Sequence, residues 1–160
     1  MAETWVVNAS PMIVLAKVGH LDLLLRLSDV LIIPAAVAAE IVAAPDTDPA
    51  RIAMVAGWKQ PASEVTIPDV VLEWSLGAGE SSVLAHALEA FTATAVLDDL
   101  AARRAAAALG IPVIGTLGII LRAKVRGLIP EARSVIERVR AAGLYLPVSI
   151  IESALTQIGE

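Results

Sequence analysis

Short apolar runs alternate with helical segments along most of this 160-residue chain, and this alternation restricts the fold more than any other feature. Each run has the length of a strand, and the segment after it repeats apolar residues at helical spacing. Strands that are separated by helices pair in parallel, with the helices covering the sheet. The composition agrees, because 57% hydrophobic residues with only 3% aromatics is typical of α/β layers built from Ala, Val, Leu and Ile. The sequence predicts an α/β fold around a parallel sheet.

Helix-start signals set the expected boundaries. Ser10 precedes Pro11 after the first apolar run, and a Ser cap with Pro at the first helical position favours a helix start. Thr116 is expected to cap a later helix in the same way. We expect one domain over residues 1–129, with residues 130–160 forming a helical extension packed on the same domain. The expected strands are 5–8, 29–33, 64–67, 94–97 and 112–114, and the expected helices are 10–19, 20–27, 34–42, 50–58, 81–90, 100–109, 116–126, 130–142 and 147–158.

Composition and hydropathy exclude several classes of protein. The chain has no cysteine, so it has no disulfide, thiolate metal site or cysteine nucleophile, which is compatible with a reducing cytoplasm. The uncharged stretch 105–121 is broken by Pro112 and by glycines, and it is shorter than the ~20 residues of a membrane-spanning helix. The N-terminus carries Glu3 and no basic flank, unlike a secretory signal. We expect a cytoplasmic protein with no membrane segment.

Two adjacent carboxylates follow the apolar run 94–97. Asp98 and Asp99 would then lie at the carboxyl end of a strand, where hard oxygen ligands suit a divalent cation that keeps some of its waters. The alternative is that one aspartate caps the helix starting near Leu100 and the other is solvated. The pair alone does not decide between these two interpretations.

Further polar residues are expected near the same edge of the sheet. Asn8 and Ser10 follow the first strand, Glu80 stands at a helix start, and Thr116 follows the last strand. Glu40 lies on the helix after the second strand. Acids that converge at one edge could hold one or two Mg²⁺ or Mn²⁺ ions, activate a water and stabilise charge during phosphodiester hydrolysis.

The net charge of −5 is unevenly distributed. Residues 1–102 carry 13 acidic and 4 basic residues, whereas residues 103–140 carry 8 basic and 2 acidic residues. Arg103 and Arg104 lie one turn beyond the aspartates, where they would contact a phosphate or pair with the same acids. We expect the two histidines and the three tryptophans to be packing or surface residues. The remaining bases of the basic region are expected on solvated helix faces; they are Arg122, Lys124, Arg126, Arg133, Arg138 and Arg140.

Four segments, in their order along the chain, resemble the PIN-domain family, in particular its uncharacterised bacterial and archaeal PIN-like proteins. The similarity runs from about Trp5 to Ile129. It implies a three-layer α/β/α sandwich around a parallel sheet, metal-dependent cleavage of RNA, and often a toxin role beside a small antitoxin protein. The segments are VVNASPMIVLAKVGHLDLL, LIIPAAVAAEI, GAGES and VLDDLAARRAAAALGIPVIGTLGIILRAKVRGLI.

The resemblance also assigns residues. It places the family's first acid at Asn8, where an amide offers an oxygen ligand but no charge and cannot act as a base. The first hypothesis is a Mg²⁺- or Mn²⁺-dependent endoribonuclease. The departure at Asn8 favours a second hypothesis, a catalytically weak or inactive protein that binds RNA or a partner. A receiver domain phosphorylated on Asp98 or Asp99 is a third, although it lacks an obvious partner lysine. A second copy of the chain is a further candidate partner. The resemblance assigns Asn8, Glu40, Glu80, Asp98 and Asp99 to catalysis, the last four of these to metal, and Ser10 and Thr116 to the substrate. Arg103 and Arg104 are added to the substrate residues because of their position one turn beyond the aspartates.

Overall fold

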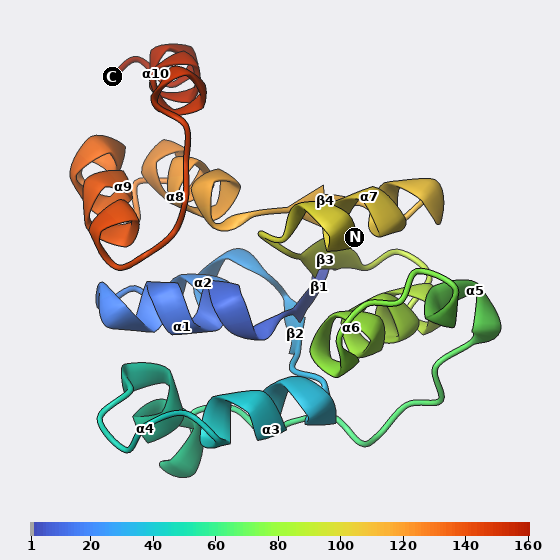
Figure 1. The fold of residues 1–160 in the computed structure, drawn as a ribbon. Helices are drawn as coiled ribbons and strands as arrows, with labels where there is room; N and C mark the ends of the chain where they lie inside the picture. Colours follow the sequence, from blue (N-terminus) through green and yellow to red (C-terminus); the bar gives the residue numbers. More distant parts are fainter. Residues whose placement is uncertain (1) are drawn as a thin grey trace.

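A computed structural model describes residues 2–160 as four parallel strands with helices on both sides (Figure 1). The strand order is β2-β1-β3-β4, so that β1 is paired on both edges. Helices α1, α2, α8 and α9 lie to the left of the sheet in Figure 1, and α6 and α7 lie to the right. The three-layer α/β/α sandwich and the parallel sheet are therefore confirmed. The strands are β1 (Thr4–Val7), β2 (Val30–Ile32), β3 (Thr94–Val96) and β4 (Val113–Ile114); the helices are α1 (Ala9–Lys17), α2 (Leu23–Leu27), α3 (Ala35–Val42), α4 (Pro49–Val55), α5 (Asp69–Leu72), α6 (Ala78–Glu89), α7 (Leu100–Ala108), α8 (Thr116–Val125), α9 (Ala132–Ala141) and α10 (Val148–Gln157).

Strand β1 lies in the centre of the core. Trp5, Val6 and Val7 are fully buried, because helices cover both faces of β1. Val6 pairs with Ile32 of β2 on one side and with Ala95 of β3 on the other. The Trp5 indole Nε1 donates to Glu3, which also accepts from Arg122 at 2.6 Å. Trp5 is the one aromatic residue of the four strands, and its indole N–H thus has a hydrogen-bond partner near the start of β1.

The strand expected at residues 64–67 is wrong. Residues 60–68 have no regular structure, and the Ala62 N–H donates to the O atom of Ile33, just beyond the end of β2, at 2.8 Å. Val65 and Ile67 are partly buried whereas Glu64 and Thr66 are exposed. The alternating pattern therefore comes from an extended segment that lies over helices. One side of this segment is partly buried, but its backbone does not pair with a strand. The short helix α5 that follows was not expected.

Both predicted hydroxyl caps are also wrong. Helix α1 begins at Ala9, so that Asn8 is the capping position and Ser10 is already helical and exposed. Helix α8 begins at Thr116 itself, with Gly115 before it. The hydroxyl of Thr116 faces away from its own helix and bonds to another loop, as described below.

Three of the arginines expected on solvated faces hold elements together instead. Arg122 forms an ion pair with Glu3 and lies 5.6 Å from the centre of the Trp5 ring. Arg133 pairs with Glu152 at 2.7 Å, and Arg138 donates to Val18 O at 3.1 Å. These long side chains reach across to neighbouring elements, which helical spacing does not reveal.

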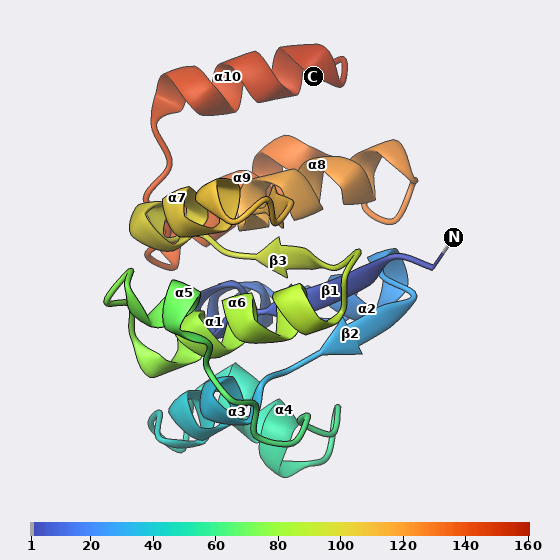
Figure 2. The ribbon, with the colours of Figure 1, turned by 90° about the vertical axis from the view of Figure 1, so that its right-hand side faces the viewer.

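The C-terminal helices lie along one side of the molecule (Figure 2). Helix α9 packs against α8 and α1, and α10 packs against α9. The Glu160 side chain accepts from the backbone N–H groups of Ala132 and Arg133 at 2.7 and 3.2 Å. The end of α10 therefore caps the start of α9, where helix N–H groups lack partners. No helix within residues 2–160 is long and apolar enough to cross a membrane.

We predict that His20 makes the protein less stable in mild acid. Burial and the charge of Arg138, whose Nη2 lies 3.1 Å from His20 Nε2, lower the pKa of His20 below 6.5. On acidification the unfolded chain therefore takes up this proton before the folded protein does, which favours unfolding. The free energy of unfolding should fall as the pH drops below about 6.5, and His20→Gln should remove this part of the dependence. Urea unfolding across this pH range measures it; an unchanged dependence in His20→Gln would contradict the assignment.

Candidate functional site

Asn8 and Asp98 follow two neighbouring parallel strands and reach the same edge of the sheet. Val7 pairs with Val96, and the Asn8 backbone N–H donates to Val96 O at 3.1 Å. The Asn8 side chain is 5% exposed, and within residues 2–160 its Oδ1 is buried with no hydrogen-bond partner. A buried carbonyl oxygen without a partner is costly, and a bound cation or water would satisfy it.

Asp98 joins the loops that follow β3 and β4. Its Oδ1 accepts from the Thr116 backbone N–H at 2.8 Å, and its Oδ2 accepts from the Thr116 hydroxyl at 2.6 Å. Thr116 is fully buried, so its hydroxyl requires a partner inside the protein. Both oxygens of Asp98 thus accept hydrogen bonds, which hold the carboxylate at the first residue of α8.

Asp99 is the capping aspartate of the pair. Its Oδ2 accepts from the Ala102 backbone N–H at 3.0 Å, and its extended backbone starts α7. Asp98, in contrast, is partly buried and bonded rather than solvated. Asp99 therefore has the capping role that the sequence left open, whereas Asp98 is bonded to Thr116 instead of being solvated.

Glu40 and Glu80 meet where the end of α3 touches the start of α6. Glu40 Oε1 accepts from the Gly79 backbone N–H at 3.1 Å, and Glu80 Oε2 accepts from the Gly77 N–H at 3.2 Å. Gly79 permits this approach, because a Cβ there would lie 3.0 Å from the Glu40 carboxyl carbon and closer still to Oε1. Each glutamate keeps one oxygen outside these bonds.

One cavity collects three of the five residues assigned to catalysis. Asn8, Glu40 and Glu80 line a hollow of about 360 Å³ together with Ser10 and Lys17, and we call it the acidic cavity. Lys17 was missed by sequence reasoning. The signal was available, since Ser10 and Lys17 are seven positions apart and therefore share one face of α1.

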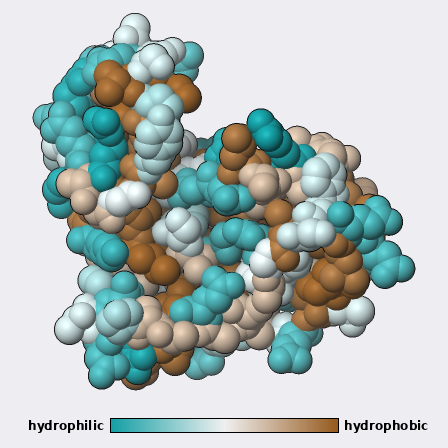
Figure 3. All heavy atoms as spheres, viewed as in Figure 1, coloured by the Kyte–Doolittle hydropathy of each residue, from teal (hydrophilic) through white to brown (hydrophobic). Residues whose placement is uncertain are grey.

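Asp98 lines a separate hollow of about 570 Å³ with Arg103 and Tyr145, which we call the aspartate cavity. Figure 3 shows a hollow between the lobe of α10 and the rest of the molecule, on the side where this cavity lies. Leu144 lines both cavities. The expected four-carboxylate cluster is therefore divided, and within residues 2–160 no three acids or histidines are grouped as they would be around a bound metal.

The two arginines of α7 differ in their surroundings. Arg103 is partly buried and donates through Nη1 to Leu97 O at 3.0 Å, whereas Arg104 is exposed. A Cβ at Gly115 would lie 2.6 Å from Arg103 Nη1 and 3.0 Å from Asp98 Oδ1, so the glycine leaves room for both groups. Within the described chain neither arginine forms an ion pair with the aspartates.

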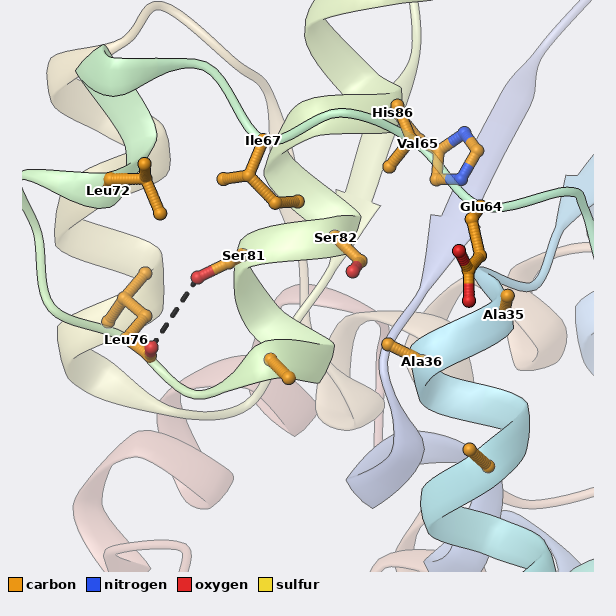
Figure 4. Close-up of a pocket in the computed structure, with 12 residues that line it drawn as sticks. Ala35, Ala36, Glu64, Val65, Ile67, Leu72, Leu76, Ser81, Ser82 and His86 are labelled. Atoms are coloured by element: carbon orange, nitrogen blue, oxygen red, sulfur yellow. Dashed lines mark hydrogen bonds between the residues drawn. The ribbon is translucent and has the colours of Figure 1, made fainter.

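A third hollow, of about 450 Å³, lies between α3 and α6 and is lined by none of the assigned residues (Figure 4). His86, Ser82 and Glu64 point toward it from two sides, and Ser81 Oγ donates to Leu76 O at 3.5 Å. The His86 Nε2 is buried and has no partner within residues 2–160. His86 is partly buried, as expected from its apolar helix face.

Fold and site together define an α/β/α domain in which Asn8 and Asp98 follow neighbouring strands at the carboxyl edge of a parallel sheet. The sequence profile of a family described as PIN domain matches residues 4–160, and the chain belongs to the PIN-domain family. Comparison with curated proteins finds no match. Membership of this family supports a nuclease-type function, the use of divalent metals and an RNA substrate in general terms.

We predict that Thr116→Val destabilises the protein. The substitution nearly preserves volume but removes the hydroxyl that donates to the Asp98 carboxylate. Loss of a hydrogen bond to a charged group should lower the free energy of unfolding by about 1–3 kcal/mol. Thr116→Ser keeps the hydroxyl and serves as the control in urea unfolding. Equal stability of Thr116→Val and the wild type would show that this contact contributes nothing.

Proposed function

We propose that this protein is a metal-dependent endoribonuclease that hydrolyses phosphodiester bonds of RNA. The observation that carries the proposal is the acidic cavity, which is lined by Glu40, Glu80 and Asn8, whose buried amide oxygen has no partner within residues 2–160. Ligands of parallel α/β sheets bind at this edge. The family supports a nuclease in general, and the acidic cavity gives the proposal specific residues.

The oxygen atoms present fit a hard divalent cation. Glu40 and Glu80 each keep an oxygen free of the bonds to glycine N–H groups, and Asn8 Oδ1 has no partner within residues 2–160. Mg²⁺ or Mn²⁺ prefers such ligands, and a bound ion would supply an activated water and stabilise charge on the phosphate. Asp98 lines the aspartate cavity and not the acidic cavity, and both of its oxygens bond to Thr116, so it would contribute to such a site only through a remaining lone pair. Asp99 caps α7 and would add only its charge.

The remaining residues have roles that follow from their positions. Ser10 lines the acidic cavity and can donate a hydrogen bond to RNA. Arg103 lines the aspartate cavity, and Arg104 is exposed on the same helix, so both guanidinium groups can reach a phosphate. Thr116 acts by holding Asp98 in place.

A second candidate function is a catalytically weak or inactive PIN protein that binds RNA or a partner without cleaving it. Asn8 favours this function, because it removes one charge from the metal ligands and leaves no base at that position. The engagement of both Asp98 oxygens favours it as well.

We also propose that the protein is the toxin of a toxin–antitoxin pair in the cytoplasm, with a small antitoxin protein as its partner. This step rests on the family resemblance. We expect the neighbouring gene to encode a small DNA-binding protein, and expression of the chain alone to slow growth. Growth that recovers on co-expression of the neighbour would support the toxin role, and absence of any growth effect would contradict it.

We predict that Asn8→Asp strengthens metal binding and cleavage. Without a cation the buried carboxylate should lower the melting temperature, and Mn²⁺ should raise it more than in the wild type. Cleavage of single-stranded RNA with Mn²⁺ should increase by about tenfold or more, the equivalent of about 1.4 kcal/mol of added stabilisation. Gln60→Glu adds the same charge on an exposed loop and should change neither property.

Glutamate variants complete this experiment. Glu80→Gln should abolish Mn²⁺-dependent cleavage, whereas Glu89→Gln, an exposed position of the same helix, should not. If the wild type cleaves no RNA and Asn8→Asp does, the native protein is the non-cleaving alternative.

A further inference from the structure

Residues 142–147 connect α9 to α10 and lie beside both cavities. Ala142, Gly143 and Leu144 line the acidic cavity, whereas Leu144 to Pro147 line the aspartate cavity. We call this segment the 142–147 connection. A strand of nucleic acid that reaches from one cavity to the other must therefore pass over it.

Tyr145 is an exposed aromatic residue in the 142–147 connection. Its side chain is 85% exposed and lines the aspartate cavity together with Arg103. Phe91 is the comparable residue elsewhere, with 94% of its side chain exposed, but it lies just before β3, at the opposite end of that strand from Asp98. An exposed ring beside an arginine and a carboxylate site offers a flat face on which a base can stack.

Lys17 lies at the acidic cavity, on the other side of the 142–147 connection. It is exposed in the last turn of α1 and lines the acidic cavity, two helical turns or about 10 Å from Ser10. No hydrogen bond or ion pair of its ammonium group is present within residues 2–160. Glu40 and Glu80 line the same cavity and repel a phosphate, and the positive charge of Lys17 offsets part of this repulsion.

We propose that a single-stranded RNA crosses the 142–147 connection, with one base stacked on Tyr145 and a phosphate bound by Lys17. The nature of the ligand rests on the proposed function, but the two contacts do not require cleavage. Arg103 assists on the Tyr145 side, where its guanidinium donates to Leu97 O through Nη1 and keeps its other N–H groups for a phosphate. A base inside a duplex is stacked on its neighbours and presents no face to Tyr145, so the strand must be single.

The first experiment measures stacking directly. A short single-stranded RNA carrying 2-aminopurine is titrated with the full protein in Ca²⁺, under conditions in which no cleavage is seen. Stacking on Tyr145 should quench the probe, Tyr145→Ala should remove the quenching and weaken binding about 5- to 100-fold, and Tyr145→Trp should restore both. Phe91→Ala is the matched control and should behave as the wild type.

The second experiment counts phosphate contacts. The slope of log Kd against log salt concentration should decrease by about 0.7 in Lys17→Gln, as expected for one lost contact to a single strand. Lys17→Arg should keep the slope. Lys59→Gln removes the same charge after α4, where it lines neither cavity, and should keep it as well.

The outcomes separate this inference from the proposed function. One outcome is that the protein binds RNA with Tyr145-dependent quenching and yet cleaves none with Mn²⁺. That result would support the proposed path of RNA over the 142–147 connection and overturn the proposed nuclease activity. Cleavage and binding that are unchanged in both Tyr145→Ala and Lys17→Gln would support the nuclease and overturn the crossing. Absence of single-stranded RNA binding by the wild type would also overturn the crossing.

Discussion

Parallel pairing of β1 with β2 and β3 is the constraint on which the rest of the structure depends. It buries β1 on both faces and aligns Val7 with Val96, so that the chain leaves both strands at one edge. Asn8 and Asp98 are 90 positions apart in sequence and are brought to that edge by the backbone alone. The helices that follow then begin there too, and their first N–H groups face the same space.

Those N–H groups explain how several carboxylates can gather without basic partners. Glu40 accepts from Gly79 in the first turn of α6, Asp98 accepts from Thr116 at the start of α8, and Asp99 accepts from Ala102 of α7. Each helix start stabilises a negative charge through its unpaired N–H groups. The arginines are therefore left for other contacts, as Arg103 shows by bonding to a backbone carbonyl. The same bonds also occupy carboxylate oxygens that a metal would use. The lack of a charge at Asn8 therefore weakens metal binding further.

Local sequence signals predicted the parallel sheet, because two-sided burial of strands and the periodicity of helices can be recognised in consecutive residues. The family was indicated by the resemblance of four segments in their order along the chain. The segment 64–67 was misread, since an extended chain lying over helices shows the same alternation as an edge strand. The division of Asp98 and Asp99 into a bonded and a capping residue required the position of Thr116, which lies on another strand's loop. The separation of the two cavities depends on the 142–147 connection, whose position no pattern near the carboxylates reveals. The boundary at residue 129 stays a prediction, although the family profile continues to residue 160.

The C-terminal helices matter to the site because they hold that connection in place. Glu160 caps the start of α9, and Arg133 pairs with Glu152 of α10, so the two helices are joined near the end of the chain. Ile151 and Leu155 are buried between them and the core. The 142–147 connection is therefore tethered at both ends to helices that pack against each other. An exposed ring on a tethered segment loses little conformational entropy when a base stacks on it, which favours Tyr145 as a binding residue over an equally exposed side chain on a free tail.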